Sequence, residues 1–193
     1  TASPAVYLLG NWAAPFGIVL VVDRLAAVMV TLTIVLSVAT LIYSLARWHG
    51  TGRFPALLQF LIMGLNGAFL TGDLFNLFVF FELLLAASYG LSLHGSGVAR
   101  VRASLHYIVV NLAASLLFLV GVSLIYGVTG TLNMAHLAER IPLIASTDRA
   151  LLDAGVAILA VAFLVKAAMW PLGFWLPTTY SAAAAPAAAL FAI

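Results

Sequence analysis

Long apolar runs without charge, separated by short polar turns, constrain this chain more than any other feature of its sequence. The first run, residues 25–46, contains no charged side chain. An α-helix of that length rises about 1.5 Å per residue and can cross a hydrocarbon layer of about 30 Å. Across the 193 residues, 65% are hydrophobic and 7% are charged, which leaves too little charged surface for a soluble domain of this size. The sequence therefore predicts a polytopic membrane protein.

The same pattern recurs along the chain and predicts one all-α transmembrane helix bundle over residues 1–193. Spans are expected at about 25–46, 54–71, 74–93, 103–127 and 150–170, with the start of a further helix at 181–193. Residues 1–22 are expected to form a loop at the membrane surface, and a short surface helix is expected at 131–140. The tight Gly72-Asp73 link, in which Asp73 can cap a helix, predicts that the second and third spans are antiparallel neighbours. The chain begins without Met and stops inside an apolar run, so it is interpreted as an internal fragment of a longer protein.

Basic residues in the connections predict how the bundle is oriented in the membrane. The connections after the first and third spans, 47–53 and 94–102, contain four arginines and no acidic residue. The connections on the opposite side carry five acidic residues, Asp23, Asp73, Glu139, Asp148 and Asp153. Positively charged loops are enriched on the cytoplasmic side of membranes. The two basic loops are therefore expected in the cytoplasm.

One carboxylate, Glu82, stands alone in the apolar run 72–90. A charged side chain at the centre of a membrane-spanning helix costs on the order of 3 kcal/mol on insertion scales, so it normally faces protein or water and has a function. Lys166 is the second charge deep in an apolar span, at a comparable depth and of opposite sign. The sequence therefore predicts an ion pair between Glu82 and Lys166, which can couple to proton movement if it forms and separates. A static pair that only fixes helix packing is the alternative, although a buried pair stabilises weakly compared with apolar packing.

Two further patterns accompany the two charges. Tyr107, Asn111 and Ser115 recur every four residues in the fourth span, which predicts a polar stripe that faces protein rather than lipid. Pro171 and Pro177 follow the fifth span and predict a broken helix with freed carbonyl groups, as found beside transport pathways. An ordinary interfacial helix end with aromatic anchoring is the alternative to the broken helix.

Three segments in order, residues 60–95, 102–134 and 163–193, closely resemble the D subunit of the Mrp (also Pha or Mnh) multisubunit monovalent cation/proton antiporters. The first contains GDLFNLFVFFELLLAASYG and the last contains FLVKAAMWPLGFWLP. This family is related to the antiporter-like subunits of respiratory complex I. The resemblance implies that Glu82 and Lys166 are the functional glutamate and lysine of the family. It also implies an antiporter-like inverted-repeat fold, whose second repeat and its own central charged residue lie outside this chain.

The resemblance further implies a membrane subunit of a Na⁺ or K⁺/proton antiporter, which is a secondary transporter and not an enzyme. The expected partners are other subunits of the antiporter complex, protons, Na⁺ or K⁺ and the lipid bilayer, with no nucleic acid. The expected location is the bacterial inner membrane, which is the cell membrane. His106 falls where relatives often have a lysine or a histidine, and the resemblance implies that it passes protons between the Glu82–Lys166 pair and the centre of the subunit. A plain polar residue at a helix entrance is the alternative for His106.

No cofactor is expected from the sequence. Cysteine is absent, which excludes thiolate-bound zinc, iron–sulfur centres and disulfides within this chain, and no paired-histidine pattern supports a haem bound to His106. The main alternative function is a proton-pumping membrane subunit of an NADH:quinone oxidoreductase or a membrane-bound hydrogenase. Gly173 argues against it, because complex I relatives usually have a histidine at that position. A purely structural scaffold is the third hypothesis, and the sequence does not indicate which cation is exchanged.

Overall fold

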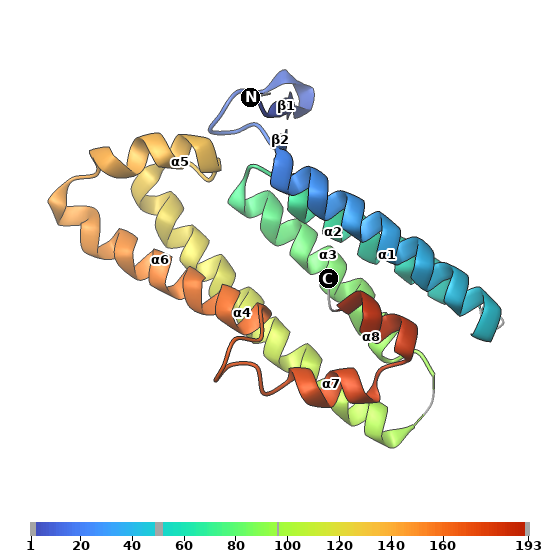
Figure 1. Ribbon diagram of the computed structural model, residues 1–193. Helices are drawn as coiled ribbons and strands as arrows, with labels where there is room; N and C mark the ends of the chain where they lie inside the picture. The colour runs from blue at the N-terminus through green and yellow to red at the C-terminus, as the bar shows by residue number, and fades with distance from the viewer. Residues whose placement is uncertain (1–2, 49–51, 96, 192–193) are drawn as a thin grey trace.

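The computed structural model describes residues 3–48, 52–95 and 97–191, and it confirms the predicted all-α bundle (Figure 1). The helices are α1 (Arg24–Trp48), α2 (Phe54–Leu70), α3 (Leu74–Ser92), α4 (Val98–Thr129), α5 (Met134–Arg140), α6 (Ser146–Lys166), α7 (Leu176–Ala182) and α8 (Ala185–Phe191). Parts of the predicted basic loops, residues 49–51 and 96, and the chain ends 1–2 and 192–193 lie outside the described residues.

Three of the described helices are long and apolar enough to cross a membrane, by length and composition: α1 over Arg24–Arg47, α3 and α4. Helix α2 is also apolar, but with 17 residues it is shorter than these three helices. Helix α6 has Asp148, Arg149 and Asp153 in its first half and Lys166 at its end. The arrangement of five spans therefore stays a prediction.

The N-terminal segment differs from the expected surface loop. It contains an antiparallel β-hairpin, β1 (Ala5–Leu8) and β2 (Val19–Val22), in which Ala5 is opposite Val22. Three of the four β2 residues are valine, whose branched side chains favour extended backbone. The loop prediction was wrong because the Pro and Gly residues mark only the turn between two short apolar strands.

Helices α2 and α3 are antiparallel neighbours, as the tight link between them predicted. Gly64 lies against Leu84 and Gly67 against the ring of Phe80, so residue numbers rise along one helix as they fall along the other. A side chain at Gly67 would meet that ring at 2.2 Å, so glycine is what lets the two helices approach. This contact determines which face of α3 packs against α2 and which face points away from it.

Backbone hydrogen bonds join three connections at one end of the bundle, called here the hairpin end. The Gly72 N–H donates to the Val19 carbonyl of β2 at 2.8 Å, and the Met134 N–H donates to the Gly72 carbonyl at 2.8 Å. Asp73 caps α3 as predicted, because its Oδ1 accepts from the Asn76 N–H at 2.9 Å. The start of α3 is thereby fixed beside the end of α4. The opposite end, where α3 ends and α4 begins, is called the basic-loop end.

Helices α4 and α6 form the second antiparallel pair, in which α6 lies beside the C-terminal half of α4 while α7 lies against its N-terminal half (Figure 1). Gly121 of α4 and Gly155 of α6 lie at the point of closest approach, where a side chain on Gly121 would meet the Leu159 nitrogen at 2.8 Å and the Gly155 oxygen at 2.9 Å. The helical path is then interrupted: α6 ends at Lys166, an irregular segment leads to α7, and α8 packs against α1 and α3. The helix expected from residue 181 is thus divided between α7 and α8.

The predicted surface helix at 131–140 begins later than expected. Helix α5 begins at Met134 because the preceding residue, Asn133, caps it: its side-chain oxygen accepts from the His136 N–H at 3.1 Å. The helix ends at Arg140, directly before a 3-10 turn that contains Pro142.

Candidate functional site

Glu82 lies near the middle of α3, and its side chain is half-buried in the described part of the chain. Helix α3 begins at the Asp73 cap, and apart from Glu82 its residues 77–87 are all apolar, so a carboxylate at this position needs polar groups from other helices. The face of α3 that carries Glu82 is directed toward α4. Ser115 of α4 supplies the hydroxyl that donates a hydrogen bond to the Glu82 carboxylate.

Lys166 is the last residue of α6. The nearby Ala168 has a positive φ of 51°, which turns the chain out of the helix. The Val165 carbonyl accepts from the Ala168 N–H and from the Trp175 indole N–H, each at 3.1 Å, so the helix is broken before Pro171 and Pro177, as predicted, and its end is stabilised by protein. The break leaves the Lys166 ammonium at a helix C-terminus, where a cation is favourable.

Ser115 of α4 lies between the two charged side chains. Its hydroxyl donates a hydrogen bond to Glu82 Oε1, and its oxygen accepts from Lys166 Nζ at 3.1 Å. Across residues 3–48, 52–95 and 97–191 there is no direct ion pair between Glu82 and Lys166, so that prediction was wrong in its geometry. The two charged side chains come from α3 and α6, and the Ser115 hydroxyl of α4 bridges them through hydrogen bonds.

Phenyl rings close the hairpin side of these three residues. Lys166 Nζ lies 5.4 Å from the centroid of the Phe81 ring, within the range of a cation–π contact. Phe81, Phe118 and Phe163 contact one another with centroid distances of 5.4 to 6.3 Å in edge-to-face arrangements, and Phe118 is fully buried. These three rings occupy the side of Ser115 that faces the hairpin end.

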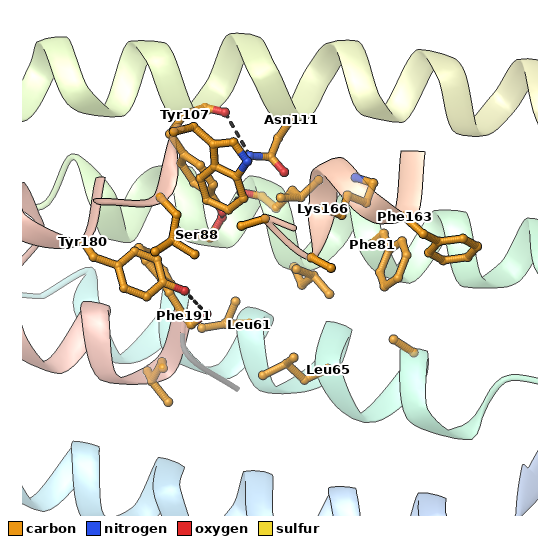
Figure 2. Close-up of a pocket in the computed structure, with 18 of the residues that line it drawn as sticks. Leu61, Leu65, Phe81, Ser88, Tyr107, Asn111, Phe163, Lys166, Tyr180 and Phe191 are labelled. Atoms are coloured by element: carbon orange, nitrogen blue, oxygen red, sulfur yellow. Dashed lines mark hydrogen bonds between the residues drawn. The ribbon is translucent and has the colours of Figure 1, made fainter. Parts of the chain in front are cut away.

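Lys166 also lines a cavity of about 660 Å³, together with Phe81 and Phe163 (Figure 2). Leu61 and Leu65 of α2 line one wall, while Lys166, Asn111 and Tyr107 line the opposite wall. The predicted polar stripe is confirmed, because Tyr107, Asn111 and Ser115 are each no more than 5% exposed. The Tyr107 hydroxyl is hydrogen-bonded to Ser88 at 2.8 Å, and the Asn111 amide donates to the Tyr107 carbonyl at 3.1 Å.

His106 is not brought together with the other two predicted site residues. It lies on an exposed face of α4, and its ring is 5.6 Å from that of Phe174 in the irregular segment before α7. Nine residues of helix, about 14 Å along the axis, separate it from Ser115. The neighbouring Gly173 lies where a side chain would meet the Ala168 carbonyl oxygen at 2.2 Å. A histidine at position 173 is thus incompatible with this backbone.

The bridging role of Ser115 was not predicted from the sequence, although its burial was. A partial signal was available, because Ser115 is one turn from Asn111 on the predicted polar stripe. The contact of Lys166 with Phe81 had no such signal, because Phe81 is one of many apolar residues in its run.

The fold and this arrangement define a class, the antiporter-like membrane subunits. In a comparison of solved structures, the chain superposes on the Mrp complex from Dietzia sp. DQ12-45-1b with a TM-score of 0.88 and 37% identity, over 98% of this chain and 35% of that one. It superposes on respiratory complex I from Thermus thermophilus with a TM-score of 0.73 and 26% identity, over 94% of this chain and 40% of that one. Residues 71–193 match the family described as NADH:quinone oxidoreductase/Mrp antiporter, TM. The chain belongs to this family.

Curated relatives agree with the resemblance found in the sequence. The chain is 66% identical over 189 residues to the D subunit of a probable K(+)/H(+) antiporter from Rhizobium meliloti, covering 97% of this chain and 35% of the relative. It is 47% identical over 186 residues to the D subunit of a Na(+)/H(+) antiporter from Alkalihalophilus pseudofirmus, covering 95% of this chain and 37% of the relative. The chain therefore spans little more than a third of the length of these relatives.

Proposed function

We propose that this chain is part of a membrane subunit of a multisubunit monovalent cation/proton antiporter, in which protons move through Glu82 and Lys166. The observation that carries the proposal is the meeting of an acid and a base of opposite sign at one hydroxyl in the apolar interior. The relatives named as D subunits of Na(+)/H(+) and K(+)/H(+) antiporters support the class of transport. Other subunits of the complex, Na⁺ or K⁺, the lipid bilayer and a bacterial cell membrane belong to the same proposal.

The chemistry of the proposal is a change of charge in a medium of low polarity. The charged pair is neutral as a whole, so binding one further proton, or losing one, leaves an unbalanced charge that the apolar surroundings disfavour. Relief of that imbalance requires movement of a proton or of a compensating cation. This requirement is what couples proton movement to cation movement.

A second candidate function is a proton-pumping subunit of a respiratory or hydrogenase complex. It is favoured by the match to the membrane-bound sulfane sulfur reductase, an archaeal respiratory membrane complex, with a TM-score of 0.88 and 35% identity over 96% of this chain and 38% of that one. The close contact at Gly173 weighs against a histidine-dependent path in this chain. Co-purification of the complete subunit with iron–sulfur subunits would favour this second function.

The leading proposal predicts that Glu82→Gln in the complete complex abolishes exchange. The amide still accepts a hydrogen bond from Ser115, but it cannot bind and release a proton, and loss of a positioned proton-transfer group costs about 100-fold or more in rate. Exchange is measured in everted membrane vesicles with a fluorescent pH indicator, with Na⁺ and K⁺ added separately. The control is Glu139→Gln, which alters an exposed carboxylate on α5. Wild-type exchange by Glu82→Gln, with either cation, would overturn the proposal.

For His106 we propose an accessory role in proton passage at the exposed face of α4. Because about 14 Å of helix separates it from Ser115, His106→Gln is expected to lower exchange by less than roughly tenfold, far less than Glu82→Gln. The same vesicle assay measures both variants. A loss as large as that of Glu82→Gln would instead place His106 in the same step as the pair.

A further inference from the structure

The Ser115 hydroxyl accepts one hydrogen bond and donates another, so a continuous chain of hydrogen bonds connects Lys166 with Glu82. It accepts from Lys166 Nζ at 3.1 Å and donates to Glu82 Oε1. We infer that Ser115 is a proton relay, through which Lys166 and Glu82 exchange a proton without touching each other. This inference rests on the proposed function, and it adds a residue and a step that the pair alone does not supply.

The direction of the hydrogen bonds fits a relay. A serine hydroxyl has one donor hydrogen and two acceptor lone pairs, so it can receive a proton on one side and release one on the other. An ammonium can only donate and a carboxylate can only accept. The Ser115 hydroxyl is therefore held in the one orientation that points its hydrogen toward Glu82.

The step can be written with all atoms accounted for. One N–H bond of the Lys166 ammonium breaks and its proton forms an O–H bond with Ser115 Oγ, while the original O–H bond of Ser115 breaks and that proton binds Glu82 Oε1. The products are a neutral amine, an unchanged hydroxyl and a neutral carboxylic acid. No oxidant, reductant or further reactant takes part. The reverse step restores the charged pair.

Ser115 also departs from what a buried helical hydroxyl usually does. Such hydroxyls commonly donate to a carbonyl of the preceding turn, as Thr33 does to Met29, Ser92 to Tyr89 and Thr129 to Ile125 in this chain. Ser115 instead donates to a different helix. Ser115 is 3% exposed, so this hydrogen bond to another helix lies in the interior of the protein.

The surroundings give the proton few other routes between the two groups. The rings of Phe81, Phe118 and Phe163 close the hairpin side. On the cavity side, the Asn111 amide donates to the Tyr107 carbonyl and the Tyr107 hydroxyl is hydrogen-bonded to Ser88, and neither of these partners among the described residues is Lys166 or Glu82. In the described part of the chain, Ser115 is thus the one side chain that contacts both Lys166 and Glu82 through hydrogen bonds.

The test compares Ser115→Ala with Ser115→Thr in the complete complex, with rates normalised to the amount of assembled complex. Alanine removes the hydroxyl, and exchange is expected to fall by at least roughly tenfold, at the lower side of what a positioned proton-transfer group contributes. Threonine keeps the hydroxyl, and exchange is expected to stay within about twofold of wild type. The control is Ser92→Ala, a buried serine whose hydroxyl donates to the Tyr89 carbonyl of its own helix.

A second readout separates a relay from a packing role. Exchange is measured in H₂O and in D₂O, and the ratio is expected to rise in Ser115→Ala because proton transfer becomes the slow step. A residue that only positions helices would lower the rate and leave that ratio unchanged. Equal loss in the alanine and threonine variants, or an unchanged ratio in Ser115→Ala, would overturn the relay.

The outcome also distinguishes this inference from the function on which it rests. If Glu82→Gln is inactive while Ser115→Ala exchanges at the wild-type rate, the pair functions without the relay and only the inference fails. If Glu82→Gln is itself active, the proposed function fails first.

Discussion

Lys166→Met is expected to abolish cation/proton exchange in the complete complex, and Lys166→Arg is expected to do so as well. Methionine keeps much of the length of the side chain but removes the cation, so the bridge to Glu82 through Ser115 is lost and the Glu82 carboxyl group is left without a compensating charge in the apolar interior. Arginine keeps the charge but remains protonated at all accessible pH values. Either variant removes the exchangeable proton of residue 166, and the expected loss is about 100-fold or more.

The two variants separate charge from proton release. Exchange is measured in vesicles with Na⁺ and K⁺ separately, and assembly is checked by the yield of intact complex in mild detergent. Arg149→Lys serves as the matched control because it alters a basic residue in the same helix, exposed and near its other end. Wild-type exchange by Lys166→Arg would show that the charge of residue 166 suffices and that its proton does not move.

The second large effect is expected from Gly121→Val, through packing rather than chemistry. At Gly121 the backbones of α4 and α6 are so close that even one added carbon would lie 2.8 Å from the Leu159 nitrogen. Overpacking of this kind typically costs about 1–3 kcal/mol and sometimes more. The helices must move apart, which also moves Ser115 away from Lys166. Thermal unfolding of the purified complex, followed by loss of assembly, is expected at a lower temperature than in wild type.

Gly127→Ala is the control for this substitution. It is on the same helix, almost two turns from Gly121, and an added carbon there has no neighbour within 4 Å. The stability of Gly127→Ala is expected to equal or slightly exceed that of wild type, because alanine in a helix is about 1 kcal/mol more favourable than glycine. Equal stability of Gly121→Val and wild type would contradict the close approach of α4 and α6.

Much of the helical framework could be predicted from the sequence because apolar periodicity and charge placement are local signals. The Asp73 cap, the antiparallel pairing of α2 with α3 and the buried stripe Tyr107–Asn111–Ser115 all follow from such signals. The hairpin in the first 22 residues did not, because two strands of four residues carry too little pattern to be separated from a loop.

The site could be predicted only in part, for a different reason. Two opposite charges in apolar runs identified Glu82 and Lys166, but how they meet depends on helix rotation and on where α6 ends. Sequence spacing measures depth along a helix and not the distance across the bundle. The hydroxyl between the two charges therefore appears only when α3, α4 and α6 are placed together.

The Lys166 side chain meets two kinds of surroundings. Its ammonium lies over the ring of Phe81, which packs against the rings of Phe118 and Phe163. The same side chain lines the cavity, together with Tyr180 and Phe191 of the last two helices. Under the proposed function, these surroundings predict that a proton reaches Lys166 more readily through the cavity than through the packed rings.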